Sequence, residues 1–131
     1  MDTKKKIELD FCVIQLLQQD VVQYELNVNM PLTTEKAEVI LKTCNELVKG
    51  KYYLLNIMNA KLQPSADVFD FYASKKRQEH IIADAFVLNS PELKLMSNFY
   101  LKLKKPQIPT KVFSDSRRAL AWIEQMKREE H

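Results

Sequence analysis

Hydrophobic and polar residues alternate over much of the first thirty positions of the chain. Apolar side chains occupy every second position of segments 7–13 and 22–28, with mostly polar residues between them. Such alternation is typical of strands that have one buried face and one exposed face. The polar segment 18–20 separates the two stretches. We therefore predict two antiparallel strands joined by a short turn, which form an N-terminal β-hairpin.

The spacing of apolar residues changes to three and four positions in the next part of the chain. The residues with this spacing are Ala37, Ile40, Leu41, Cys44, Leu47 and Val48. They fall on one face of a helix, which Thr33 or Thr34 is well suited to cap. Gly50, the single glycine of the sequence, is expected to end this helix in a left-handed conformation.

Segments 51–58 and 81–88 are apolar on both of their alternating faces. Short runs of this kind are typical of parallel strands that are covered on both sides. We expect 51–58 to be the central strand of the sheet, with Leu55 and Ile57 fully buried. A shorter strand is expected at 111–113.

Three more helices are predicted between and after these strands. The first extends from Ser65 to about Gln78, the second begins at Ser90, and the third is capped by Ser114 or Asp115. The inner face of the second consists of Leu93, Met96, Phe99, Tyr100 and Leu103, and that of the third of Ala119, Trp122, Ile123 and Met126. Each helix is expected to pack through this face.

The predicted order of elements is therefore ββαβαβαβα. Alternating strands and helices imply an α/β fold, a mostly parallel sheet built of successive βα units with right-handed crossovers. The N-terminal β-hairpin is expected at one edge of this sheet. The length of 131 residues suits a single domain over 1–131.

The composition, with 46% apolar and 28% charged residues, is ordinary for a globular protein. No stretch approaches the ~18 apolar residues of a membrane span, so we expect neither membrane insertion nor export. Cys12 and Cys44 lie in apolar surroundings without CxxC spacing, which favours small core residues in a reducing compartment. The expected location is the cytoplasm.

The charge of the chain does not indicate a nucleic-acid partner. Twenty Lys and Arg residues against 17 Asp and Glu residues give a net charge of only +3. Basic residues gather at 4–6, 75–77, 102–105 and 117–118, but acidic residues are interspersed along the chain. We therefore expect these groups on solvated faces.

Few residues in the sequence suggest catalysis. A chain with one glycine has no Gly-rich loop for phosphates, and His80 and His131 have no neighbouring metal ligands or cysteine partner. We expect no enzymatic activity, no cofactor and no metal. Asp84 is the one charge in strand 81–88, and a buried carboxylate needs a partner. We expect it to be structural, either exposed at the strand start or paired with a neighbouring lysine.

Several segments in the second half of the chain resemble small bacterial STAS-like proteins of unknown function. They are 84–90, 98–100, 106–109, 112–113 and 119–123. The order of elements is also similar to that of STAS and CRAL-TRIO-like folds, in which an N-terminal hairpin leads into successive βα units. The resemblance implies a STAS-like fold and says little about chemistry.

The resemblance also implies a place where partners bind. In STAS antagonists of anti-sigma factors, the loop after the central strand carries Asp-Ser-Ser-Gly, and a serine there is phosphorylated. Here segment 63–67 is Gln-Pro-Ser-Ala-Asp, so Ser65 matches the first serine and Ala66 occupies the phosphoacceptor position. We expect Ser65 to be an unmodified helix cap, and Lys61, Leu62 and Gln63 to contact a partner by shape and polarity.

These observations predict a non-enzymatic cytoplasmic STAS-like domain that acts by protein–protein contact, with a protein partner or by self-association, in signalling or regulation. The alternative is a carrier or sensor of a lipid or a small anionic ligand. Ligands of open parallel sheets lie beyond the carboxyl ends of the strands. The candidate interaction or anion site there consists of Asn59, Lys61, Leu62, Gln63, Ser65, Asn89, Ser90 and Ser114. These polar residues also suit helix caps and turns.

Overall fold

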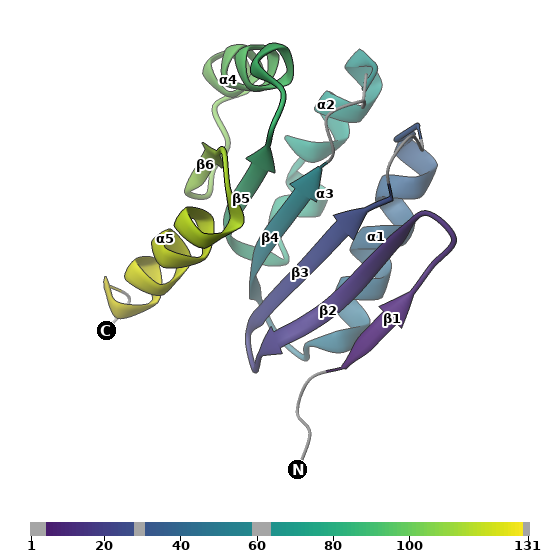
Figure 1. Ribbon diagram of the computed structural model, residues 1–131, viewed down its shortest axis with the longest axis vertical. Helices are drawn as coiled ribbons and strands as arrows, with labels where there is room; N and C mark the ends of the chain where they lie inside the picture. Colours follow the sequence, from purple (N-terminus) through teal and green to yellow (C-terminus); the bar gives the residue numbers. More distant parts are fainter. Residues whose placement is uncertain (1–4, 28–30, 59–63, 130–131) are drawn as a thin grey trace.

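The computed structural model describes residues 5–27, 31–58 and 64–129. Within these residues, six strands form one sheet whose spatial order is the same as their order along the chain (Figure 1). The strands are β1 (Lys6–Glu8), β2 (Cys12–Gln18), β3 (Val21–Leu26), β4 (Tyr52–Met58), β5 (Ile81–Leu88) and β6 (Thr110–Phe113). The first three are antiparallel, and β3 to β6 are parallel. The predicted fold class is confirmed.

The helices divide between the two faces of the sheet and its upper end. They are α1 (Thr34–Leu47), α2 (Ala66–Tyr72), α3 (Lys75–Gln78), α4 (Pro91–Lys104) and α5 (Ser116–Glu129). In Figure 1, α1, α2 and α3 lie behind the sheet, α5 crosses its front, and α4 lies above the ends of β5 and β6. The parallel strands are therefore covered on both faces, as helical crossovers require.

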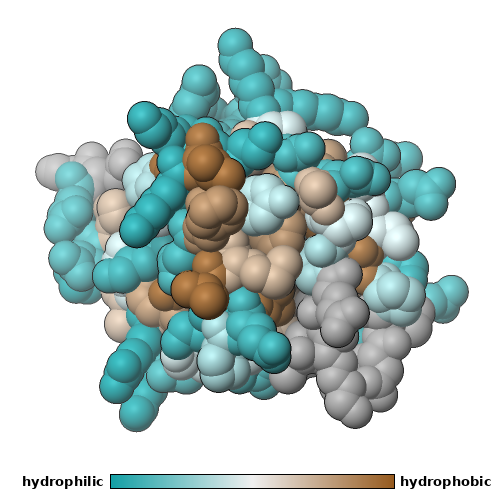
Figure 2. Space-filling model, turned by 90° about the horizontal axis from the view of Figure 1, so that it is seen from above, coloured by the Kyte–Doolittle hydropathy of each residue, from teal (hydrophilic) through white to brown (hydrophobic). Residues whose placement is uncertain are grey.

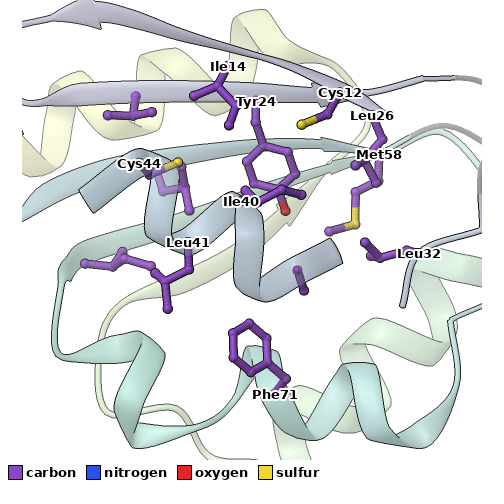
Figure 3. Close-up of a cluster of buried hydrophobic side chains, with 14 of the residues drawn as sticks. Cys12, Ile14, Tyr24, Leu26, Leu32, Ile40, Leu41, Cys44, Met58 and Phe71 are labelled. Carbon is purple, nitrogen blue, oxygen red and sulfur yellow. The ribbon is translucent and has the colours of Figure 1, made fainter. Parts of the chain in front are cut away.

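The larger core lies between the sheet and the helices behind it. Ile40 and Cys44 of α1 point toward strand residues such as Ile14 and Tyr24, and Leu41 belongs to the same core (Figure 3). The spacing that predicted this helix is confirmed, and Thr33 caps it by accepting a hydrogen bond from the Lys36 amide. Cys12 and Cys44 are free and buried, as expected.

The smaller core lies under α5 on the front of the sheet. Ala119 and Ile123 are fully buried there against Leu55 and other residues of the central strands, while Trp122 and Met126 pack at its margin. Leu55 is buried as predicted, but the full burial predicted for Ile57 is wrong. Ile57 is half-buried at the edge of this core, near the upper end of β4.

The N-terminal region contains one more strand than the alternation predicted. Segment 7–13 does not continue as one strand, because the chain turns at 9–11, where the Leu9 amide donates to the carbonyl of Cys12 at 2.8 Å. Ile7 then pairs with Ile14 and Glu8 with Val13. A tight turn without Gly or Pro left the alternating pattern almost unbroken, so the pattern concealed it. The predicted hairpin is formed by β2 and β3.

Two predicted helix boundaries are also wrong. Gly50 does not end α1 in a left-handed conformation, because the helix stops at Leu47 and Val48 is already extended. The left-handed conformation occurs instead at Lys105, which ends α4 with a φ of 47°. The helix predicted from Ser65 to Gln78 is interrupted after Tyr72, and its second part, α3, begins after Ser74.

Candidate functional site

A buried cluster of polar side chains joins the central parallel strands to α3. Asn56 of β4 and Asp84 of β5 lie on the face of the sheet against which α3 packs. Arg77 of α3 contacts both of them. The Arg77 guanidinium donates to both carboxylate oxygens of Asp84, at 2.5 Å to Oδ2 and 3.2 Å to Oδ1. Asn56 donates to Asp84 Oδ1 at 2.7 Å and accepts from Arg77 Nη2 at 3.0 Å. The three side chains therefore form a closed network.

Charge and burial are balanced within this network. Burial disfavours the charged form of Arg77, but the attraction of Asp84 outweighs it and holds the pKa of the guanidinium above its ordinary value. The Tyr72 ring lies 4.3 Å from the guanidinium carbon, which adds a cation–π contact. Among the described residues, no buried side-chain nitrogen or oxygen lacks a hydrogen-bond partner. The polar groups of these three side chains are therefore satisfied by bonds within the protein, and the network has a structural role.

The structural role expected for Asp84 agrees with this geometry. The expectation that Asp84 is exposed or paired with a lysine is wrong. Asp84 is 2% exposed and pairs with Arg77, not with a lysine. Arg77 belongs to the basic group that was expected on a solvated face. Ser74 accepts a hydrogen bond from the Arg77 amide at 3.3 Å and so starts a new helix, in which Arg77 is buried while Lys75 and Lys76 stay exposed. A serine three positions before Arg77 is the signal that sequence reasoning missed.

Two tyrosines extend the polar region toward β3. The hydroxyl groups of Tyr24 and Tyr72 share a hydrogen bond of 2.8 Å. Burial raises the pKa of Tyr72 to about 12 and raises that of Tyr24 well above its ordinary value. Both side chains are therefore neutral at physiological pH and serve as hydrogen-bonding core residues.

A cavity of about 70 Å³ lies beside Asp84, between α2, α4 and the sheet. Its lining is mainly apolar and includes Leu32, Met58, Val68, Phe86, Leu93 and Val112. Two contacts join α2 to α4 at this cavity. The rings of Phe69 and Tyr100 stack in parallel with centroids 4.3 Å apart, and Lys104 pairs with Asp70 at 2.9 Å. An apolar space is thus bordered by contacts between two helices.

The outer face of α4 exposes large apolar side chains. Leu95 is 74% exposed, Met96 43%, Phe99 59% and Leu103 60%. The prediction that Met96, Phe99 and Leu103 face inward is therefore wrong, since Leu93 is the buried residue of this helix and Tyr100 is half-buried. Viewed from the end where α4 lies, the molecule shows a strip of hydrophobic surface between hydrophilic side chains (Figure 2). We call these four residues the α4 stripe.

Polar residues at the carboxyl ends of β5 and β6 surround the start of α4. Ser90 caps this helix by accepting from the Leu93 amide at 3.3 Å, as predicted. Ser114 accepts a hydrogen bond from Lys94, so the two loops are connected. Asn89 is exposed beside Ser90. Asp115, the second predicted alternative, caps α5 by accepting from the Arg118 amide at 2.8 Å.

Comparison with known proteins gives a family and a fold. Residues 15–127 match the family described as a domain of unknown function, DUF7793. The chain belongs to this family. Among solved structures, it is similar to an uncharacterized protein from the DUF3478 family with a SpoIIAA-like fold from Shewanella loihica PV-4. The TM-score is 0.52 and the identity 14%, with 91% of this chain and 90% of that chain covered. No curated protein matches.

The structural similarity confirms the STAS-like fold predicted for this DUF7793 chain and, at such low identity, shows the fold alone. Four of the predicted site residues, Asn59, Lys61, Leu62 and Gln63, lie outside the described residues. None of the helices in the described ranges is long and apolar enough to cross a membrane. In the same ranges, no three His, Cys, Asp or Glu side chains are grouped so that they could hold a metal ion.

Ser65 of this DUF7793 chain occupies the predicted N-cap position of α2, but its side chain makes no capping hydrogen bond. Its backbone carbonyl accepts from the amides of Val68 and Phe69 at 3.1 and 3.3 Å. The side-chain cap predicted for Ser65 is therefore wrong. The expectation that Ser65 is unmodified stays a prediction. The side chain is exposed at the start of a helix that packs against α4.

Proposed function

We propose that this protein is a non-enzymatic domain that acts in signalling or regulation by binding protein through the α4 stripe. The observation that supports this proposal is the exposure of Leu95, Phe99 and Leu103, each more than half exposed on one helix face. Single exposed apolar residues are ordinary, but a contiguous group of them marks an interaction surface. Complete burial of such a side chain from full exposure contributes about 1.5–3 kcal/mol, and these side chains gain the share that corresponds to their exposed surface when a partner covers them.

The buried polar network supports a structural role for the charged residues of the core. Arg77, Asp84 and Asn56 bond to one another, and Asn56 also donates to the Ala85 carbonyl at 2.8 Å. A group that acts on a substrate needs donors or acceptors directed toward it. Here the network directs its donors and acceptors to its own members and holds α3 on the sheet. Contact with another molecule is therefore left to side chains on the surface.

Affinity capture with matched variants tests the proposal. Tagged wild type, Phe99→Asp and Val39→Asp are used to capture proteins from the native host, and each captured protein is then purified for calorimetric titration. Val39→Asp is the matched control, because Val39 is an apolar residue that is 42% exposed on α1, outside the stripe. We expect a partner that binds wild type and Val39→Asp but not Phe99→Asp. Equal binding by all three proteins contradicts the role of α4.

The cavity favours a second candidate function, a carrier or sensor of a lipid or small ligand. Its lining is mainly apolar, and Lys104 at its margin would bind an anionic head group in place of its present partner, Asp70. The volume of about 70 Å³ is less than half of the ~150 Å³ apolar cavity that admits benzene, so an acyl chain enters only if the cavity widens. Native mass spectrometry of protein from its own host tests this candidate. A retained small molecule supports it, and bare protein contradicts it.

A further inference from the structure

We infer that the partner of the α4 stripe is a second copy of this chain, with the two α4 helices packed antiparallel about Phe99. This inference rests on the proposed function, because it names the protein that covers the same surface. It follows from the order of residues along α4, from the charges at its two ends and from the contacts that fix its flanking lysines.

The apolar residues of α4 are placed symmetrically about Phe99. Leu95 lies four positions before it and Leu103 four positions after it, so the three side chains occupy successive turns of one face. An antiparallel pair of such helices places Phe99 beside Phe99, and Leu95 beside Leu103 of the other copy. Each large side chain then meets an apolar partner. This self-complementary arrangement is the one that a two-fold axis requires.

The charges of α4 favour the antiparallel orientation over the parallel one. Glu92 lies in the first turn, and Lys102 and Lys104 lie in the last. In an antiparallel pair about Phe99, Lys102 of the other copy lies level with Met96, about 6 Å along the axis from Glu92, at both ends of the contact. A parallel pair instead places Glu92 beside Glu92 and Lys102 beside Lys102. Like charges at these positions oppose association.

The other lysines of α4 are directed away from this contact. Lys94 donates to Ser114, and Lys104 pairs with Asp70 of α2 at 2.9 Å. In the antiparallel pair these two lysines lie at the same level, but their ammonium groups are held at the flanks of the helix by these partners. The centre of the contact is thus left to the α4 stripe, which Figure 2 shows as a hydrophobic strip.

The size of the contact predicts a dimer that dissociates on dilution. A helix of 14 residues is about 21 Å long and 10–12 Å wide, so its one face is smaller than the ~800 Å² per partner of stable complexes. The association should therefore be visible in a dilution series. Its affinity should depend strongly on the few large side chains at the centre.

Sedimentation velocity across a dilution series is the first test. We expect wild type to shift from monomer to dimer as its concentration rises. Leu95→Asp should weaken association about a hundredfold or more, because a two-fold dimer contains the substitution twice. Val39→Asp should associate like wild type. Leu95 is 74% exposed, so its variant keeps the fold, which circular dichroism checks.

Charge exchange tests the orientation. Glu92→Lys and Lys102→Glu should each weaken the dimer, and the double variant should restore it, since only antiparallel packing pairs these two positions. Disulfide trapping gives an independent readout, because Cys12 and Cys44 are fully buried. Phe99→Cys should crosslink to itself, and Leu95→Cys should crosslink to Leu103→Cys but not to itself. Val39→Cys measures random collision.

Three outcomes overturn the inference. Wild type that stays monomeric at every concentration excludes a second copy as the partner, and the proposed function then stands if capture of another protein still depends on Phe99. A dimer that Leu95→Asp leaves intact forms through another surface and contradicts the inference, and the proposed function then depends on whether capture of another protein requires Phe99. Self-crosslinking of Leu95→Cys above the collision control shows a parallel pair and contradicts the orientation.

Discussion

The two helices α3 and α4 differ in which side chains they bury. The four-residue helix α3 places the guanidinium of Arg77 in the core, whereas the 14-residue helix α4 leaves Leu95 and Phe99 in solvent. Hydropathy alone predicts the reverse. Arg77 is buried because Asp84 and Asn56 satisfy it, and α4 exposes its apolar face because it lies beyond the upper end of the sheet, where Leu93 alone is buried.

The two helices therefore show two kinds of side chain, one that stabilises the fold and one that is free to bind another molecule. A buried ion pair is costly to break, because removing one partner leaves an uncompensated charge. An exposed apolar side chain contributes little to the fold of its own chain and is available to another molecule. The α3 region should therefore respond in stability measurements, and the α4 stripe should respond in association measurements.

Removing the carboxylate of Asp84 is expected to give the largest loss of stability. Asp84→Ala leaves the buried Arg77 guanidinium without its counter-ion and should lower the free energy of unfolding by about 3–5 kcal/mol. Denaturant titration measures this loss. Lys76→Met is the matched control, because Lys76 is exposed and its ion pair with Glu38 spans 4.0 Å, so the effect there should be about 0–1 kcal/mol. Equal effects of the two substitutions contradict the structural role of the network.

Truncation of the central strand is expected to have an effect of similar or slightly smaller size. Leu55→Ala empties a position that is 1% exposed under α5 and should cost about 2–5 kcal/mol. Thermal and denaturant unfolding both report it. A loss below about 1 kcal/mol would show that α5 collapses onto the site or does not cover it.

The sequence predicted the elements that periodicity controls. The alternation of 22–28, the stripe of α1 and the doubly apolar runs 51–58 and 81–88 each correspond to an observed element. Burial on one or two faces of an element determines these patterns, so they can be recognised from the local sequence. The α/β order and the STAS-like fold followed from them.

The sequence did not predict features that depend on tertiary position. The stripe of α4 has helical spacing whether a sheet or solvent lies beneath it, so its exposure has no local signal. The burial of Arg77 depends on Asp84, seven residues away, after a break at Ser74. Of the candidate site residues, Ser90 and Ser114 lie close to Lys94 at the start of α4, and Asn59, Lys61, Leu62 and Gln63 lie outside the described residues.

Alkaline pH is expected to destabilise the larger core by a smaller amount for each pH unit. Burial raises the pKa of the Cys44 thiol from its ordinary value of 9.0 to about 12. The unfolded chain loses this proton above pH 9.0 while the folded chain retains it, so unfolding releases a proton and rising pH favours unfolding. The contribution is about 1.4 kcal/mol for each pH unit between these values.

Denaturant titrations of wild type and Cys44→Ala between these pH values test this prediction. The variant should show a shallower loss of stability with pH, whatever its stability at neutral pH. A wild-type slope that Cys44→Ala leaves unchanged would mean that the thiol ionises without unfolding.

Truncation of the α4 stripe is expected to give the smallest effect on the isolated chain. Phe99 is 59% exposed, so Phe99→Ala should change the free energy of unfolding by less than about 0.5 kcal/mol in dilute solution. The contrast with Leu55→Ala then measures directly what burial contributes.

At higher protein concentration the effect of Phe99→Ala on stability should be larger, because association stabilises the folded state of wild type by mass action. The melting temperature of wild type should rise with concentration, and that of Phe99→Ala should not. Scanning calorimetry at several protein concentrations, with Val39→Ala as the control, distinguishes these cases. A melting temperature of wild type that is independent of concentration would show that the stripe contributes nothing through a second copy.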